Sequence, residues 1–307
     1  MHVPAEELIY AFHSDLVPAT RVSTPTTVVF DTVDALGGQV RAEGDTIDGL
    51  DFDRVNPATG PLGIDSARPG DVLAVDIRSI ELPDQGAIIA GPGLGVLPDA
   101  LDAPLSRILP IRDGHVIFGD LRLPARPMIG VIGVAPESGS YPTGTAYRHG
   151  GNMDAKEIGP GATVYLPVFR PGAALALGDV HAVMGDGEVC VSACEVSASV
   201  TARLRVLPGM DLRWPLVETD KALIFLISLP SIEDALREAT AQAVAYLQRT
   251  LSMPFGDAYL LASLTVDIGI SQLVDPNKTA KAVIPKWLVG EFGVQHSGPT
   301  APAAGAS

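Results

Sequence analysis

The feature that most constrains the fold is a run of eleven residues, from 196 to 206, in which apolar and polar side chains alternate without interruption. The apolar set is Val196, Ala198, Val200, Ala202, Leu204 and Val206, and the polar set is Ser197, Ser199, Thr201, Arg203 and Arg205. Successive side chains of a β-strand point to opposite faces of its sheet, so this period of two predicts a single half-buried strand. Glu195 is in phase with the polar set, and we expect it to project from the face opposite Val196.

Other segments carry the same strand signal and are bounded by turns. Strands are predicted at 26–33, 72–82, 128–134 and 163–169, and turn sequences rich in glycine and proline lie at 58–61, 68–71, 158–162 and 170–173. One long helix is predicted to begin after Ser231, a favourable N-cap residue that follows Pro230. A shorter helix is predicted after Pro254, through Asp257 to Leu264.

The order of these elements predicts an α+β fold that is predominantly β. We expect β-sandwich or jelly-roll-like sheets, with a smaller helix-containing α/β portion late in the chain. In this interpretation residues 1–210 form a β-rich portion that carries the site, and residues 211–292 form a helix-containing portion packed on it in one integrated globular unit. Residues 293–307 are small, polar and proline-rich, which is typical of a disordered tail.

Composition narrows the possible partners. The formal net charge of −15 at pH 7 would repel nucleic acid and anionic lipid, so neither is an expected partner. No segment approaches the roughly 20 consecutive apolar residues of a membrane helix, and the first residues lack the pattern of a secretory signal. Cys190 and Cys194 are predicted to be small buried side chains without a disulfide, as in a reducing compartment, and we expect a cytoplasmic protein.

Side chains that could carry chemistry gather in two segments. The first, HGGNMDAKE at 149–157, places Asn152, Asp154 and Lys156 in alternation, as on one face of a strand. The second, GDVHAVMGDGEVCVSACE at 178–195, contains one imidazole and several carboxylates, a set that suits a divalent cation such as Zn²⁺, Mn²⁺ or Ca²⁺. Taken alone, however, the second segment is explained more simply as a hydrogen-bonded, glycine-rich turn that carries charge.

The two segments together, in this order, closely resemble the core of the acetamidase/formamidase family. Members of that family show GGN-x-D-x-K, a Y/F-x-P-V strand, GD-x-H-x-x-Q-GDGE and then a glutamate. The resemblance continues through DALGGQ, NPATGP, GPGLGVL and the late segment AYLLASLTVDIGISQLVDPNKTAKAVIP, and it covers about residues 5–290. It implies a β-rich, usually oligomeric enzyme that hydrolyses a carbon–nitrogen bond in a small amide, with a divalent metal in some relatives.

The resemblance also implies the site residues. Six of them occupy motif positions, and Asp34 and Lys156 are weaker additions; the six are Asn152, Asp154, His181, Asp186, Glu188 and Glu195. We interpret the set as metal-assisted amide hydrolysis without an organic cofactor. The metal ligands would be His181, Asp154, Glu195 and Asp34, holding zinc or calcium, and the catalytic residues would be Glu188, Asp186, Lys156 and Asn152. Either Glu188 or Asp186 would accept the proton of water.

Several alternatives stay open at this point. Glu188 and Lys156 could act as acid and base without metal. The substrate is expected to be a small, neutral, linear amide such as acetamide or formamide, cleaved by a homodimer or higher homo-oligomer, but a cyclic lactam is an alternative. A non-catalytic β-domain that binds a cation or small ligand is another. Met184 replaces a glutamine that the family commonly has before GDGE, and this predicts a bulkier or more apolar amide.

Overall fold

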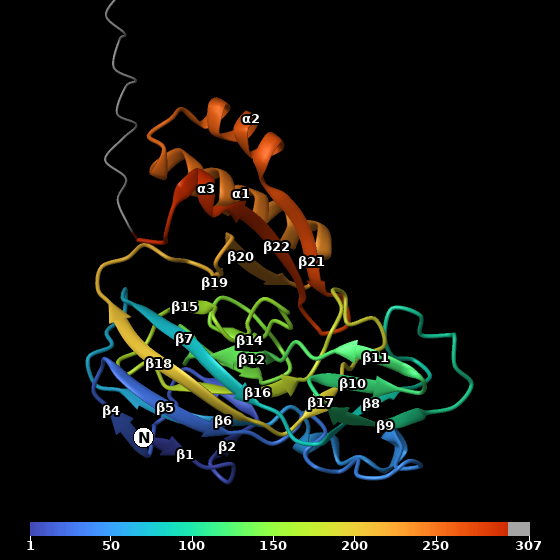
Figure 1. Ribbon diagram of the computed structural model, residues 1–307. Helices are drawn as coiled ribbons and strands as arrows, with labels where there is room; N and C mark the ends of the chain where they lie inside the picture. Colours follow the sequence, from blue (N-terminus) through green and yellow to red (C-terminus); the bar gives the residue numbers. More distant parts are fainter. Residues whose placement is uncertain (294–307) are drawn as a thin grey trace, which may run out of the picture.

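The computed structural model describes residues 1–293, and these residues form mostly β-strands (Figure 1). The predicted disordered tail therefore lies, from residue 294 onward, outside the described residues. The strands make a nine-stranded sheet, an eleven-stranded sheet and a two-stranded sheet. The small sheet pairs β3 (Ala11–His13) with β13 (Ser140–Pro142). The predicted β-rich fold class is confirmed.

The nine-stranded sheet runs through both the early and the late parts of the chain. Its order is β1 (His2–Val3), β5 (Thr26–Asp31), β18 (Ser199–Leu207), β7 (Val72–Glu81), β15 (Thr163–Pro167), β19 (Leu216–Glu218), β20 (Ala222–Leu229), β22 (Lys278–Pro285) and β21 (Asp267–Gln272). All neighbouring pairs are antiparallel except β1 with β5. The sheet continues without a break across residue 210, because β15 pairs with β19.

The eleven-stranded sheet carries the functional segments in its middle. Its main order is β11 (Leu121–Pro124), β10 (His115–Phe118), β9 (Leu105–Arg112), β8 (Gln85–Ala90), β17 (Glu195–Val196), β16 (Leu175–His181), β12 (Met128–Gly133) and β14 (Gly150–Asn152). β6 (Ala58–Ile64) also pairs with β16, and it joins β2 (Leu8–Ile9) and β4 (Thr20–Val22) to the sheet. Two 3₁₀ turns, Ile47–Gly49 and Phe52–Arg54, lie in the loop before β6.

The two large sheets pack face to face as a sandwich. Val28 of β5 and Leu73 of β7, from the nine-stranded sheet, belong to the same buried apolar cluster as Leu62 of β6 and Leu177 of β16. The central strands of the eleven-stranded sheet are covered so completely that every residue of β12 and β16 is buried. A continuous apolar run is typical of a strand that is buried on both faces.

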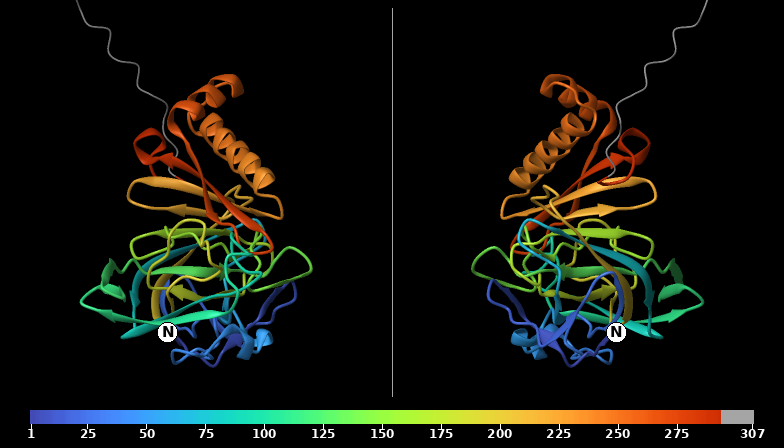
Figure 2. Two further views of the ribbon diagram at one scale, coloured as in Figure 1. Left: turned by 90° about the vertical axis from the view of Figure 1, so that its right-hand side faces the viewer. Right: turned by 90° about the vertical axis from the view of Figure 1, so that its left-hand side faces the viewer.

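The helices cover the late part of the nine-stranded sheet (Figures 1 and 2). α1 (Ile232–Thr250) begins where predicted, since the Ser231 hydroxyl accepts the N–H of Asp234 at 3.2 Å. The helix packs on β20 and β22 through one stripe of small and apolar side chains, Ala235, Ala239, Ala243 and Leu247. α2 (Phe255–Thr265) follows as predicted, and α3 (Lys286–Val289) comes after β22. No helix of the described chain is long and apolar enough to cross a membrane.

The predicted strand from 196 to 206 is wrong at its start. The chain changes sheets there: β17 belongs to the eleven-stranded sheet, and β18 begins after two intervening residues in the nine-stranded sheet. Thr32 fixes the crossing, because its N–H donates to the Ala198 carbonyl at 2.8 Å and its Oγ1 accepts the Ala198 N–H at 3.1 Å. The alternation therefore does not place Glu195 on the polar face of β18, and Glu195 is buried. The other four predicted strands are confirmed as β5, β7, β12 and β15.

Candidate active site

Adjacent strands of the eleven-stranded sheet bring the two functional segments together. β12 pairs with β14 on one side, with Val131 opposite Asn152, and with β16 on the other. β16 pairs in turn with β17, where His181 is opposite Glu195. Residues that are more than forty positions apart in the sequence, such as Asn152 and Glu195, thus come within a few strand widths of one another.

Glycine at position 130 of β12 makes room for two acids. A methyl group at this position would overlap the Oδ1 atom of Asp154 and the Oδ2 atom of Asp179. The backbone at residue 130 is ordinary strand, so the requirement for glycine comes from the space that the two carboxylates occupy. A strand residue without a side chain thus allows two acidic groups to meet over the sheet.

The backbone is strained at three of the acidic residues. Asp154, Asp179 and Glu188 adopt φ angles of 43°, 54° and 46°, in the left-handed region that residues other than glycine seldom occupy. Such a conformation costs on the order of 1–3 kcal/mol for each residue and persists where the surrounding structure fixes it. Three strained acids in one cluster are typical of a functional site.

His181 lies at the centre of this cluster and is completely buried. Its Nε2 atom is 3.0 Å from Asp179 Oδ1 and 3.1 Å from Glu195 Oε2, whereas its Nδ1 atom has no hydrogen-bond partner. The Glu195 Oε2 contact is close enough for an ion pair but does not have hydrogen-bond geometry. Burial alone would lower the pKa of His181, but the carboxylates of Glu195 and Asp179 raise it well above its ordinary value.

The pKa values of several surrounding carboxyl groups are raised, which favours the neutral form of each group. Burial, with the nearby charge of Asp179, raises the pKa of Asp154 well above its ordinary value, and burial with the charge of Asp154 does the same to Glu188. Burial also raises the pKa of Glu195, to about 7, against the opposing effect of His181. So many acids packed together are unstable as anions unless a positive charge is placed among them.

A divalent metal fits this donor set. Two groups of residues, Asp154–His181–Glu188 and Asp179–His181–Glu195, each offer ligand atoms within 4.8 Å of one another. Neither carboxylate oxygen of Asp154 has a hydrogen-bond partner, and the same is true of His181 Nδ1 and Glu195 Oε2. Buried polar atoms are nearly always hydrogen-bonded, so these unpaired atoms have the donor chemistry that a cation would satisfy.

A small cavity of about 180 Å³ opens onto this cluster, and its lining combines polar and apolar residues. The polar lining residues are Asn56, Asn152, Asp179, Glu188, Ser192, Glu195 and Asp275. The apolar lining residues are Ala35, Leu36, Ile47, Leu50, Phe52, Val55, Ile89, Leu94 and Val191. His181 and Asp154 do not line the cavity. Both belong to a candidate ligand group with the lining residue Glu188, and His181 also belongs to a group with the lining residue Glu195.

Two acidic residues that were not among the predicted site residues complete the site. Asp275 lines the cavity, and its Oδ2 atom accepts a hydrogen bond from Asn152 Nδ2 at 2.8 Å. Burial, with the charge of Glu188, raises its pKa well above the ordinary value. Asp275 lies 123 positions after Asn152, and its only local signal is a turn after β21. Asp179 did have a signal, because it lies two residues before His181 on the same strand.

Four residues named from the sequence lie elsewhere. Asp186 and Lys156 form an ion pair of 2.7 Å, and neither lines the cavity. Asp34 accepts the N–H groups of residues 36 and 38 at 3.1 Å each, which is the geometry of a loop cap. Met184 is half-buried and outside the cavity lining, so the apolar wall comes from the segment around residues 35–55 instead.

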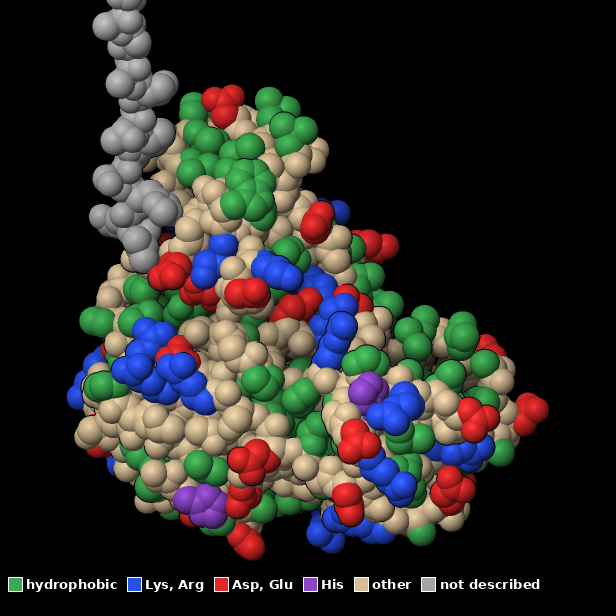
Figure 3. Space-filling view, viewed as in Figure 1, with side chains coloured by type: hydrophobic (Ala, Val, Ile, Leu, Met, Phe, Trp, Pro, Cys, Tyr) green, Lys and Arg blue, Asp and Glu red, His purple; other side chains and the backbone are tan. Residues whose placement is uncertain are grey.

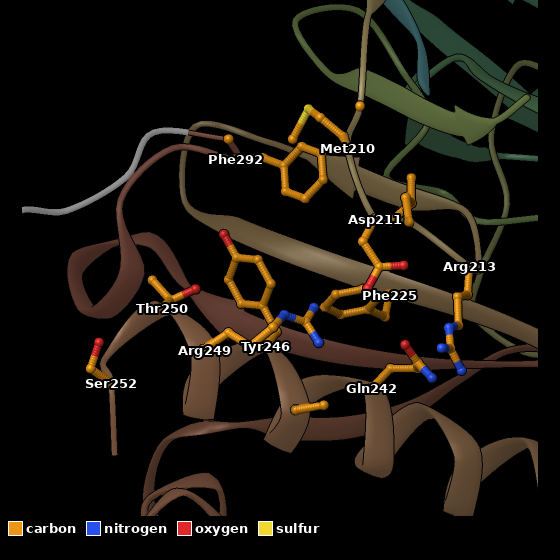
Figure 4. Close-up of a pocket in the computed structure, with 14 residues that line it drawn as sticks. Met210, Asp211, Arg213, Phe225, Gln242, Tyr246, Arg249, Thr250, Ser252 and Phe292 are labelled. Atoms are coloured by element: carbon orange, nitrogen blue, oxygen red, sulfur yellow. The ribbon is translucent and has the colours of Figure 1, made fainter. Parts of the chain in front are cut away.

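A larger cavity lies away from this cluster. It has a volume of about 750 Å³ and lies between the loop at 209–213 and α1 (Figure 4). Its lining includes Arg213, Tyr246 and Phe292 but none of the buried acids described above. Its size alone does not make it the active site, because the strained acids and the unpaired acidic and imidazole atoms of the cluster lie in or beside the smaller cavity.

Comparison with known proteins decides the family. The model of the acetamidase/formamidase family matches residues 3–141 and 138–225. The chain belongs to the acetamidase/formamidase family. The family recognised in the sequence is thereby confirmed, and with it the enzyme class, an amidase that acts on non-peptide carbon–nitrogen bonds.

Members of this family with known structures are similar over nearly the whole chain. The chain is 41% identical to a recombinant predicted acetamidase/formamidase from Thermoanaerobacter tengcongensis, with a TM-score of 0.91 over 93% of this chain and 95% of that one. It is 38% identical to an acetamidase from Bacillus halodurans, with a TM-score of 0.93 over 96% and 100%. A Schizosaccharomyces pombe protein whose name describes a formamidase is 25% identical, and the match covers 64% of this chain and 63% of that protein.

Proposed function

We propose that this acetamidase/formamidase family member hydrolyses small linear amides such as acetamide or formamide, releasing ammonia and a carboxylate. The observation that supports this most strongly is the cluster of buried, unpaired acidic and imidazole atoms beside a cavity of about 180 Å³. A cavity of this size admits a small molecule and excludes a polypeptide.

The residues that would hold the metal are His181, Asp179 and Glu195, because the other candidate group, Asp154 with His181 and Glu188, would use Glu188 as a ligand. An imidazole among carboxylates suits zinc better than calcium, which prefers six to eight oxygen ligands. When bound, such an ion polarises a carbonyl oxygen and lowers the pKa of water. Asp34 is not proposed as a ligand, because it does not line this cavity and its Oδ1 atom accepts two N–H groups of its own loop.

Glu188 is the proposed general base. It lines the cavity, where its carboxylate form can take one proton from the attacking water. That proton is then delivered to the amide nitrogen as the carbon–nitrogen bond breaks. Water thus supplies the hydroxyl group of the carboxylic acid product and one hydrogen atom of ammonia. Glu188 returns to its starting state without any other proton donor.

Asn152 is proposed to orient the substrate. Its Nδ2 atom donates to Asp275, which leaves the Oδ1 atom buried without a partner. A primary amide carries two N–H donors on the nitrogen that will leave, and one of them can satisfy this oxygen. The hydrogen bond between Asn152 and Asp275 fixes the amide side chain of Asn152, which lines the cavity.

Asp186 and Lys156 are proposed to position the loop that carries Glu188. Asp186 is paired with Lys156 and also with Lys281 of β22, at 2.7 Å in each case. Two backbone hydrogen bonds of Gly187, to the backbone of Ser271 and Leu273, attach the same loop to the end of β21. Since both lysines already neutralise Asp186, neither Asp186 nor Lys156 is assigned to proton transfer here.

Ammonia release from a panel of amides, together with metal analysis of protein purified without added ions, tests this function. We expect turnover of short linear amides and about one zinc ion bound for each active site. Turnover of cyclic lactams alone would favour the lactamase alternative. Absence of any turnover in metal-loaded, folded protein would favour a non-catalytic binding domain. Full activity of protein that is free of metal would reject metal assistance.

The cellular setting is also a proposal. Cys190 and Cys194 are free thiols, which suits a reducing compartment, and we place the protein in the cytoplasm on this ground. We further propose that the enzyme works as a homo-oligomer on a neutral amide, without a nucleic acid or membrane partner, because its formal net charge of −15 disfavours both.

A further inference from the structure

Asn56 lines the active-site cavity but has no part in the proton transfer by Glu188 or in the substrate contact of Asn152. Its backbone is strained. It adopts a φ of 49° and is followed by Pro57, although the residue before a proline favours an extended conformation. A left-handed residue of this kind costs on the order of 1–3 kcal/mol, and such residues gather at active sites and ligand-binding positions.

Two contacts hold Asn56 beside the buried acids. Its backbone N–H donates to the carbonyl of Ala35 at 2.7 Å. The carbonyl of Pro57 lies so close to β16 that a methyl group at Gly178 would overlap its oxygen. Gly178 is the last residue of β16 that pairs with β6, and Asp179 follows it. Asn56 is therefore fixed where β6 ends and β17 replaces it as the neighbour of β16.

The side chain of Asn56 does not stabilise its own turn. Asparagine tolerates a left-handed backbone partly because its short side chain can form hydrogen bonds with nearby backbone groups. Within residues 1–293, however, the amide group of Asn56 has no hydrogen-bond partner. The amide also has a defined position, since a methyl group at Gly144 would come within 3.0 Å of its Nδ2 atom. The amide group is thus available to a molecule in the cavity.

The cavity lining offers few other hydrogen-bond donors. Asn56 and Asn152 carry its only side-chain nitrogen atoms, and Asn152 already donates to Asp275. The hydroxyl of Ser192 donates to the carbonyl of Ile89 at 2.8 Å. The remaining polar lining residues are acids, namely Asp179, Glu188, Glu195 and Asp275. In the described part of the chain, Asn56 therefore has the one side-chain nitrogen of the lining that lacks a partner.

We propose that Asn56 is a further catalytic residue, whose Nδ2 atom donates a hydrogen bond to the carbonyl oxygen of the amide substrate. This role rests on the proposed amide hydrolysis. When water attacks the carbonyl carbon, an electron pair of the C=O bond moves onto the oxygen, and it returns as the carbon–nitrogen bond breaks. The negative charge on this oxygen is unfavourable beside four acids, and a donor held in place stabilises it. Asn56 transfers no proton, so the proton balance of the reaction stays that of Glu188.

Substitution by glycine tests the side chain separately from the backbone. Asn56→Gly removes the amide group but adopts a φ of 49° without strain, so its melting temperature should stay close to that of the unaltered enzyme. We expect kcat on acetamide to fall about 100-fold with KM little changed, because the hydrogen bond strengthens only as charge develops on the oxygen. Asn56→Asp is the second variant. It keeps the size of the side chain and tolerates the left-handed backbone but has no N–H donor, and we expect a loss of kcat at least as large.

Asp113→Gly is the matched control. Asp113 also has a left-handed backbone, with a φ of 51°, but it is exposed in the turn between β9 and β10 and does not line the cavity. Figure 3 shows side chains of both charge signs gathered over this edge of the sheet, at the right of the molecule. We expect this variant to keep the kcat and KM of the unaltered enzyme.

The proposal is overturned if Asn56→Gly and Asn56→Asp hydrolyse acetamide as fast as Asp113→Gly. It is equally overturned if Asn56→Gly raises KM at an unchanged kcat, because Asn56 would then bind the substrate without stabilising the transition state. Absence of turnover in the unaltered, metal-loaded enzyme would overturn the proposed hydrolysis, and the role of Asn56 with it. Failure of the residue assignment alone is thus distinguished by an unaltered enzyme that is active.

Discussion

Replacing Gly130 by alanine tests whether the close approach of two carboxylates is required for catalysis. The new methyl group would overlap one oxygen of Asp154 and one of Asp179. Non-bonded atoms settle at roughly 3.5 Å, so at least one carboxylate must move by about 1 Å. A displacement of that size at a reacting centre can lower the rate about 100-fold. Overpacking of the buried strand should cost a further 1–3 kcal/mol, roughly, in the free energy of unfolding.

Initial rates of ammonia release from acetamide give kcat/KM, and thermal unfolding followed by circular dichroism gives stability. We expect Gly130→Ala to fold and to lose at least about 100-fold in kcat/KM. Gly185→Ala is the control, because it lies in the loop that carries Glu188 and a methyl group there meets nothing within 4 Å. Activity of Gly130→Ala equal to that of Gly185→Ala would refute a catalytic role for the acids at this position.

Three further predictions concern pH, the loop ion pairs and the metal. Burial lowers the pKa of His149 from 6.5 to about 3, so the unfolded state binds a proton that the folded state does not, and stability falls as the pH drops below about 6.5. His149→Phe should remove about 2 kcal/mol of the loss between pH 6.5 and pH 5, measured by urea unfolding; an unchanged pH dependence would contradict this. Asp186→Asn should lower the melting temperature, because buried Lys281 loses one partner, and should lower kcat on acetamide far less than Glu188→Gln does, because the backbone hydrogen bonds of Gly187 still hold the loop; a loss of kcat as large as that of Glu188→Gln would place Asp186 among the catalytic residues. Removal of metal with a chelator should lower both activity and melting temperature, and added zinc should restore both by mass action; an unaffected melting temperature would argue against a bound ion among the buried acids.

The fold was largely predictable because strands and helix caps leave local signals. The sequence predicted the Ser231 N-cap and the apolar stripe of α1. Four of the five predicted strands were found within a few residues of their expected ends. The change of sheets at residues 197–198 was not predictable. It depends on hydrogen bonds from Thr32, which is 166 positions from Ala198, and no periodicity within the strand contains that information.

The site was predictable in part. The order of the family motifs along the chain indicated it, whereas the spacing of individual residues alone did not. Asp154, His181 and Glu188 belong to motifs and also share one candidate ligand group. Asp275 was missed because it reaches the cavity only through the pairing of β21 and β22 in the late portion. Asp186 was predicted as a site residue because it occupies a motif position. Its ion pairs depend on tertiary packing, which the sequence does not show.

The central claim is that the carboxyl group of Glu188 accepts the proton of water in the cavity. The rate of ammonia release from acetamide by Glu188→Gln tests it most directly, since glutamine keeps the size of the side chain and cannot take up the proton. We predict a fall in kcat of about 100-fold or more in a protein that is folded and contains metal. A kcat equal to that of the unaltered enzyme would contradict the account.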